Sequence, residues 1–312
     1  MTDGRLSVLD FLSEKPADPT WQSLPELWGG YASERARGRS PFSAAVQVAA
    51  QADRLGHAFA VGYPAALEQL LPGVRLPCAL CATEAQGNSP RAIETKLTEL
   101  AEGFRLDGQK TFVTFGTLAR TLIVVARSGL KPDGRPDIVV VQIPADRTGL
   151  VVHELPPGPF VPEVAHARLR LDGVRVHPDE RLPGDGYLRY VKPFRTIEDI
   201  HVVGSTLGYL IGWARRVGAS YAWIADLSAD LVALDALRAA EPLDARTHIV
   251  LHGCYGRLMQ TVRGDEFRRV LDSGTDGERE RWKRDQAILK VASKARELRF
   301  AAAIRAIRLD RD

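Results

Sequence analysis

The 312-residue chain has few cysteines and no long apolar run. An odd, sparse set of three cysteines, Cys78, Cys81 and Cys254, is typical of reduced thiols in a cytoplasmic protein. The longest apolar stretches, such as 121–126, are far shorter than the roughly 20 residues of a membrane span. The first residues show no basic segment followed by an apolar core, which a secretory signal requires. We therefore expect a cytoplasmic protein without a membrane partner.

The chain also carries little excess charge. It has 42 Lys and Arg against 39 Asp and Glu, a formal net charge of +3. That excess is too small to indicate nucleic-acid binding. The basic residues between 263 and 284 alternate with acidic ones, as on an ordinary solvated helix face. We expect no nucleic-acid partner.

Three short motifs lack the residues that would make them functional sites. Cys78-Ala79-Leu80-Cys81 has no second pair to complete a zinc site, so we interpret it as part of a buried strand. His248 and His252 are one helical turn apart, but no third metal ligand stands out. The serine in Gly204-Ser205-Thr206-Leu207-Gly208 is one place away from a nucleophile elbow and falls in a helical pattern. No metal is therefore expected.

The hydrophobic period changes twice along the chain. Residues 1–75 form the first region, in which a stretch with helical spacing runs from Phe42 to Leu71 and ends at Pro72-Gly73. Residues 76–188 have the period of two that is typical of strands, and 189–312 return to helical spacing. We expect an α+β multidomain fold with an N-terminal helical region, a middle antiparallel β barrel or sandwich, and a C-terminal helical bundle.

Within these regions the pattern predicts individual elements. Asp107-Gly108 has the composition of a type I′ turn and predicts a hairpin between 104–106 and 111–114. A second hairpin is predicted around the loop 131–136. The expected C-terminal helices cover 197–213, 227–240, 247–271 and 279–308.

Two segments of the β region resemble signatures of the acyl-CoA dehydrogenase family. Residues 81–89 are similar to the family's A-x-T-E-P-x-x-G-S, and residues 108–116 are similar to its G-x-K-x-W-I-T-N-G. Further along, 171–178 resembles F-D-x-V-x-V-P and 182–186 resembles L-G-x-x-G. Each motif is weak alone, but the four stand in the family's order on an α–β–α pattern.

The resemblance implies a flavoprotein that binds FAD between the β domain and the C-terminal helices. Such enzymes remove the α-proton of an acyl-CoA or acyl-carrier-protein thioester and pass the β-hydride to flavin N5, with an electron-transferring flavoprotein as a partner. By the same resemblance Phe112 replaces a tryptophan over the flavin, and the Thr114 hydroxyl lies near N5. The positions implied for FAD are Leu80, Cys81, Ala82, Thr83, Phe112, Val113 and Thr114, and Ser89 matches the serine that contacts the thioester arm.

The resemblance also implies a position for the catalytic base. Most members carry this glutamate in a loop near the C-terminus, which we expect to be missing because the sequence ends at Asp312. Members similar to isovaleryl-CoA dehydrogenase carry it at the start of the first C-terminal helix, where alignment on Leu207-Gly208 places Glu198. A first-turn glutamate that interacts with the helix dipole is the structural alternative. Asp199 beside it should raise the pKa of Glu198 by like-charge repulsion.

Departures from the family leave other functions open. The segment R-x-x-F-G, which reaches a neighbouring subunit's FAD, has no counterpart after 213–216, and Q-x-x-G-G is absent too, so we expect weak FAD binding. One alternative is a non-catalytic subunit that completes or stabilises a partner. Another is a thioester-processing enzyme that has lost FAD. Apolar residues on more than one face of the last helices predict a homo- or hetero-oligomer.

Overall fold

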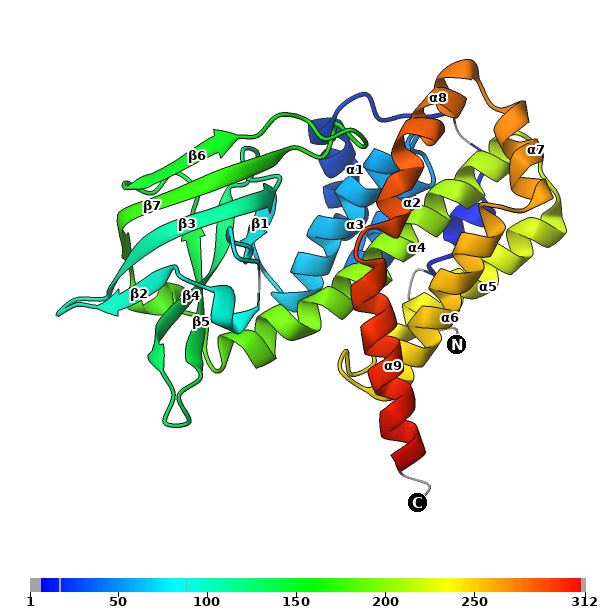
Figure 1. Cartoon of the computed structure of the whole chain (residues 1–312). Helices are drawn as coiled ribbons and strands as arrows, with labels where there is room; N and C mark the ends of the chain where they lie inside the picture. The colour runs from blue at the N-terminus through cyan, green and yellow to red at the C-terminus, as the bar shows by residue number, and fades with distance from the viewer. Residues whose placement is uncertain (1–6, 17, 88, 310–312) are drawn as a thin grey trace. The chain divides into compact units, whose positions relative to one another are not determined.

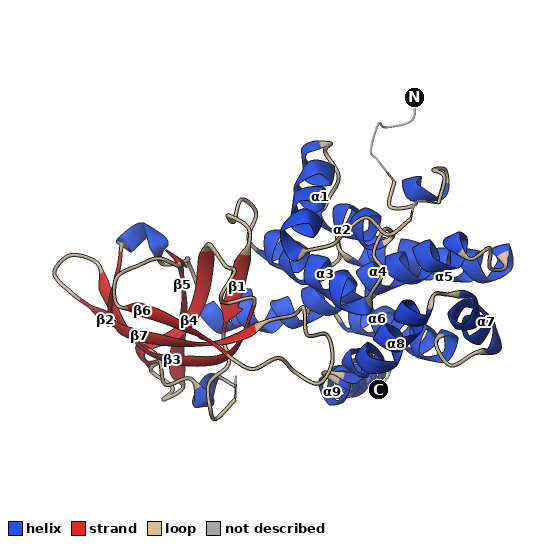
Figure 2. Cartoon of the chain, turned by 90° about the horizontal axis from the view of Figure 1, so that it is seen from above, coloured by secondary structure: helices blue, strands red, loops and turns tan. Residues whose placement is uncertain are grey.

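The computed structural model describes residues 7–16, 18–87 and 89–309, and the chain divides into two compact units. The helical unit comprises Met1–Gln69, Pro159–Glu163 and Thr196–Asp312, and the sheet unit comprises Leu70–Gly158 and Val164–Arg195. The strands belong to the sheet unit (Figures 1 and 2). The predicted α+β class is confirmed, while the three boundaries 1–75, 76–188 and 189–312 stay a prediction. No helix among the described residues is long and apolar enough to cross a membrane.

Nine α-helices occur in the described part of the chain. They are α1 (Leu24–Ala36), α2 (Pro41–Ala49), α3 (Leu55–Leu70), α4 (Lys192–Arg216), α5 (Tyr221–Leu237), α6 (Ala245–Thr261), α7 (Asp265–Ser273), α8 (Asp276–Asp285) and α9 (Ser293–Leu309). The helices predicted at 197–213 and 227–240 correspond to α4 and α5, although the structure shifts their ends.

The two long helices predicted after residue 247 are wrong, because each is interrupted. Gly264, the N-cap of α7, separates α7 from α6, since glycine stabilises a helix interior poorly. Thr275 and Glu278 then form a reciprocal capping box that starts α8. The 3₁₀-helix η5 (Gln286–Lys290) follows, and Ala292 has a φ of 62°, so α9 begins anew at Ser293.

Glycines bring α4 unusually close to α2. Gly204, Gly208 and Gly212 recur every fourth residue and therefore lie on one face of α4. A Cβ at Gly204 would lie 2.3 Å from the ring of Phe42, and a Cβ at Gly212 would lie 1.9 Å from the carbonyl oxygen of Ala50. The Gly-Ser-Thr-Leu-Gly motif is thus explained by helix packing.

The sheet unit contains one curled sheet of seven strands among the described residues (Figure 1). The strands are β1 (Cys78–Cys81), β2 (Lys96–Glu99), β3 (Phe104–Thr114), β4 (Thr121–Leu130), β5 (Pro136–Pro144), β6 (Leu150–Glu154) and β7 (His166–Val176). Their order is β1-β4-β2-β3-β7-β6, with β5 also paired to β4. The expectation of a purely antiparallel sheet needs correction, because β1 and β2 both pair with β4 in parallel.

The hairpin predicted at Asp107-Gly108 is also wrong. Residues 104–114 form the single strand β3, which pairs with β7 and has a register shift between Leu106 and Gly108. Gly108 is needed there because a Cβ would lie 2.5 Å from Thr95 Oγ1. Glycine therefore serves a bulge and a close approach instead of a turn. The second predicted hairpin is confirmed, since β4 and β5 pair antiparallel on either side of the turn at 131–135.

The three cysteines are buried thiols that form no disulfide with one another. Burial raises the pKa of Cys81 to about 12 and that of Cys254 to about 11, so both thiols stay protonated at neutral pH. We predict that the native protein resists alkylation by iodoacetamide at neutral pH and that all three thiols react after unfolding in denaturant. Mass spectrometry measures the labelling, and rapid labelling of folded protein at Cys78 or Cys81 would contradict this packing.

Candidate functional site

A buried ion pair joins the first two signature segments within the sheet unit. Lys110, whose side chain is fully buried, places Nζ 2.5 Å from Oε1 of Glu84. Glu84 also accepts hydrogen bonds from the backbone N–H groups of Glu94 and Thr95 and from the Thr95 hydroxyl. The pair and its hydrogen bonds fix the loop after β1 against β3.

Beyond this pair, β3 turns one aromatic side chain outward. The strand has a second register shift between Lys110 and Val113, and Phe112 lies within it with a φ of 56°. A left-handed backbone is unusual for a bulky residue and costs about 1–3 kcal/mol. The Phe112 side chain is nevertheless 65% exposed. A strained, exposed aromatic residue at this position is typical of a ligand surface.

The other residues implied for FAD divide by burial. The N–H of Thr111 donates to the Thr83 carbonyl at 2.9 Å, which places the end of β1 beside Phe112. Leu80, Thr83 and Thr114 are partly exposed. Cys81, Ala82 and Val113 are buried. Cys81 and Val113 belong to the hydrophobic core of the sheet unit. Their side chains pack the protein, so only their backbone groups remain for a ligand. Ser89 is exposed.

His166 on β7 belongs to the same surface and was missed in the sequence analysis. It pairs in register with Thr114, and its ring packs edge-on to Phe112 at 6.5 Å between centroids. Desolvation lowers the pKa of His166, outweighing a backbone hydrogen bond at Val164, so the ring is neutral at pH 7. The only feature of the sequence that indicates this residue is its position, a histidine at the start of the alternating segment 166–171.

The helical unit contains a cavity of about 160 Å³. Its wall is mostly apolar and is built by α3, α4, α6, η5 and the start of α9. The lining residues are Leu55, Phe59, Glu198, Asp199, Val202, Val203, Thr206, Tyr255, Leu258, Ile288, Leu289, Val291, Ala292 and Arg296. A mostly apolar cavity with a few polar groups is the usual form of a small-molecule site.

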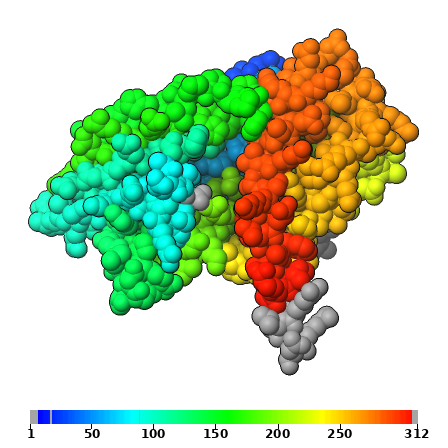
Figure 3. Space-filling model, in the orientation of Figure 1, coloured from blue at the N-terminus to red at the C-terminus, as the bar shows by residue number. Residues whose placement is uncertain are grey.

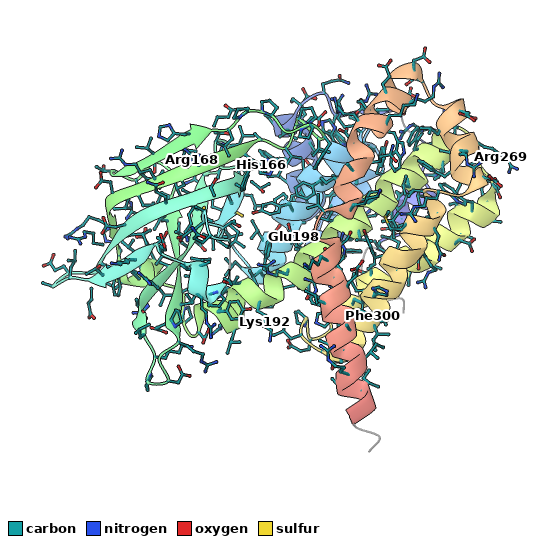
Figure 4. All side chains as sticks on the ribbon, viewed as in Figure 1. His166, Arg168, Lys192, Glu198, Arg269 and Phe300 are labelled. Atoms are coloured by element: carbon teal, nitrogen blue, oxygen red, sulfur yellow. The ribbon has the colours of Figure 1, made fainter. Side chains whose placement is uncertain are left out.

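Glu198, the sequence-predicted base, lines this cavity. Glu198, Val202 and Thr206 recur every fourth residue and so share one face of α4. The Glu198 side chain is half-buried, and Figure 4 shows it on α4 near the start of α9. Because α4 begins at Lys192, Glu198 lies beyond the first turn, and the helix-dipole explanation of this glutamate loses its basis.

Asp199, the neighbour of Glu198, is held by two guanidinium groups from α9. Arg296 Nη1 lies 2.6 Å from Asp199 Oδ1, and Arg299 bonds the other carboxylate oxygen. The predicted repulsion between Asp199 and Glu198 is therefore offset by two positive charges. Burial opposes the charged form of Arg296, but Asp199 and Tyr255 outweigh burial and raise its pKa.

His252, one of the two histidines on α6, has a packing role. Its ring stacks on Phe300 of α9 with 3.8 Å between centroids and 6° between planes. Within the described ranges no group of three or more His, Cys, Asp or Glu side chains is placed to hold a metal ion.

Comparison with known proteins relates most of the sheet unit to a known family. Residues 79–174 match the family model described as "Acyl-CoA dehydrogenase, middle domain". The fold of the chain is acyl-CoA dehydrogenase-like. The match includes the Glu84–Lys110 pair and Phe112. A search of curated proteins found no match.

Solved structures extend the likeness in fold to most of the chain. FkbI, for biosynthesis of the methoxymalonyl extender unit of the Fk520 polyketide, is 20% identical, with 98% of this chain and 94% of that chain covered and a TM-score of 0.60. Butyryl-CoA dehydrogenase from Megasphaera elsdenii is 15% identical, with coverages of 89% and 87% and a TM-score of 0.60. The prolyl acyl carrier protein oxidase AnaB is 15% identical, with coverages of 90% and 89% and a TM-score of 0.61. Because these sequence identities are low, the similarity of the structures establishes the fold of the chain.

Proposed function

We propose that the chain is an FAD-dependent acyl-thioester α,β-dehydrogenase-like flavoprotein in which Glu198 removes the α-proton. The observation that carries the proposal is that Glu198 lines a mostly apolar cavity. A carboxylate can act as a general base when it lies within reach of the substrate proton in a weakly solvated site. Its role was implied by the family resemblance independently of the cavity.

The surface around Phe112 supports the cofactor part of the proposal. An exposed aromatic ring offers a flat apolar contact for a flavin, and the Thr83 and Thr114 hydroxyls lie in the neighbouring segments. These groups fit the isoalloxazine ring of FAD, which when bound supplies the hydride acceptor for the β-carbon.

The helical unit would supply acyl binding and proton transfer. Apolar side chains from α3, α4 and α6 would contact the acyl group, and Glu198 Oε would accept the α-proton. Asp199 would not compete for that proton, because two arginines bind its carboxylate. We propose an acyl-CoA or acyl-carrier-protein thioester as substrate, since solved neighbours include a butyryl-CoA dehydrogenase and a prolyl acyl carrier protein oxidase. An electron-transferring flavoprotein is the proposed redox partner.

Replacing Phe112 should weaken FAD binding. We predict that Phe112→Ala raises the Kd for FAD about tenfold, because an aromatic contact contributes about 0.5–1.5 kcal/mol beyond its buried area and 1.4 kcal/mol is about tenfold. Calorimetric titration of the apoprotein with FAD measures the change. Leu130→Ala is the matched control, since Leu130 is an equally exposed apolar residue of the sheet unit at the far end of β4. Equal FAD affinity of wild type and Phe112→Ala would refute this assignment.

A further inference from the structure

We infer that the cavity selects a short, apolar acyl group of about six non-hydrogen atoms, and that Leu258 limits its length. The inference rests on the proposed function only in naming the ligand an acyl thioester. Size, the pairing of polar groups and the anchoring of the wall support it separately.

The volume of the cavity sets the size of the ligand. At about 160 Å³ it is close to the engineered apolar cavity of about 150 Å³ that binds benzene. Leu258 of α6 lines the cavity and its side chain is 1% exposed, so it is held firmly by its neighbours. A longer acyl chain would have to displace such side chains from a close-packed interior, which costs free energy.

The polar groups on the wall favour an apolar ligand because most already have partners. Two arginines bind Asp199, the Tyr255 hydroxyl donates to the Leu289 carbonyl at 2.6 Å, and the Thr206 hydroxyl donates to the Val202 carbonyl at 2.8 Å. Arg296 Nε has no acceptor among the described residues, but protein atoms cover it. A ligand oxygen beside these groups would therefore lose its water without gaining a free partner.

Arg296 anchors the part of the wall that lies between η5 and α9. Besides Asp199, its guanidinium binds the carbonyl oxygens of Leu289 at 3.1 Å and Val291 at 2.6 Å, and it lies 4.1 Å from the centroid of the Tyr255 ring. Ala292 is held in a left-handed backbone between these contacts. Figure 3 shows the segment from α8 to α9, orange to red, on the surface of the helical unit. The anchoring gives this surface segment a fixed position, so the cavity cannot easily lengthen there.

Leu258→Ala tests the inference, with Leu251→Ala as its control. Both leucines are buried in α6, at 1% and 3% exposure, but Leu251 does not line this cavity. Equilibrium binding of butanoyl-, hexanoyl- and dodecanoyl-CoA is measured by calorimetry on a Glu198→Gln background, so that bound thioester is not consumed. We expect hexanoyl-CoA to bind at least about tenfold tighter than dodecanoyl-CoA, since a methylene in an apolar pocket changes discrimination by about 10–200-fold. Leu258→Ala should lower the ratio of hexanoyl-CoA to dodecanoyl-CoA affinity about tenfold, and Leu251→Ala should leave this ratio unchanged.

The outcomes separate this inference from the proposed function. In one outcome the protein prefers short chains, Leu258→Ala shifts this preference, and yet no thioester is oxidised. That result would support the cavity assignment and refute the proposed dehydrogenase activity. Oxidation with equal preference for long chains, or the same shift in both leucine variants, would refute the cavity assignment alone. Absence of binding by every thioester, or tighter binding of hydroxylated or carboxylated chains of equal length, would overturn the inference.

Discussion

Glu198→Gln is expected to lower kcat/KM for thioester oxidation by about 10²–10⁴-fold, the usual contribution of a general base. Glutamine keeps the size of the side chain and its hydrogen-bonding groups, but it has no basic oxygen for the α-proton. FAD affinity should not change, because the residues proposed for FAD belong to the sheet unit and Glu198 belongs to the helical unit. Steady-state kinetics and an FAD titration on the same preparation measure the two effects.

Glu297→Gln is the matched control, since Glu297 is exposed on α9. Unchanged turnover by Glu198→Gln would show that another group is the base. Glu84 and Asp199 are the next residues to test, and in the structure each carboxylate binds at least one basic side chain. Lys110 and Thr95 bind Glu84, and Arg296 and Arg299 bind Asp199.

Lys110→Met is expected to destabilise the sheet unit by about 3–5 kcal/mol, the usual cost of removing one partner from a buried ion pair. The substitution would leave the Glu84 carboxylate buried without its counter-ion. Denaturant unfolding monitored by circular dichroism measures the change. Arg170→Met is the control, because Arg170 pairs with Asp172 on the surface and such pairs contribute about 0–1 kcal/mol.

The double variant Glu84→Gln/Lys110→Met should recover most of the lost stability, since it removes the unpaired charge as well. Full stability of Lys110→Met alone would contradict the assignment of the pair as a structural link between the two signatures.

The Glu84–Lys110 pair should also make the stability of the protein depend on pH. Burial alone would raise the pKa of Glu84, but the hydrogen bond and charge of Lys110, with the donors of Glu94 and Thr95, outweigh burial and lower it. A carboxyl with a lowered folded-state pKa stabilises the fold fully above its unfolded-state pKa, and this contribution is lost as pH falls through the folded-state pKa. Wild-type unfolding free energy should therefore fall on acidification by more than that of the double variant.

The sequence predicted the α–β–α arrangement because each region buries apolar residues with a single period. The family resemblance identified residues 81–89 and 108–116, but it did not predict the ion pair between Glu84 and Lys110 that joins them. The sequence did not predict that Asp107-Gly108 is a bulge, because the same dipeptide suits a tight turn and only the approach of Thr95 selects the bulge. The strained backbone of Phe112 likewise follows from pairing with β7, which lies more than 50 residues away in the sequence.

The cavity could not be predicted for a related reason. Its wall combines residues from α3, α4, α6, η5 and α9, and no local pattern shows which faces of these helices meet. The arginine partners of Asp199 could not be predicted, because Arg296 and Arg299 follow it by 97 and 100 residues. The prediction for the pKa of Glu198 therefore considered only the repulsion by Asp199.

Anaerobic addition of hexanoyl-CoA to the FAD-loaded protein, followed by visible absorption, tests the central claim most directly. The account predicts that the flavin band loses intensity with the wild type and persists with Glu198→Gln, because hydride transfer to FAD requires loss of the α-proton. A protein that stays colourless after incubation with excess FAD would contradict the account and favour a non-catalytic subunit. A flavin band that hexanoyl- and butanoyl-CoA and the corresponding acyl-carrier-protein thioesters leave unchanged would contradict it as well.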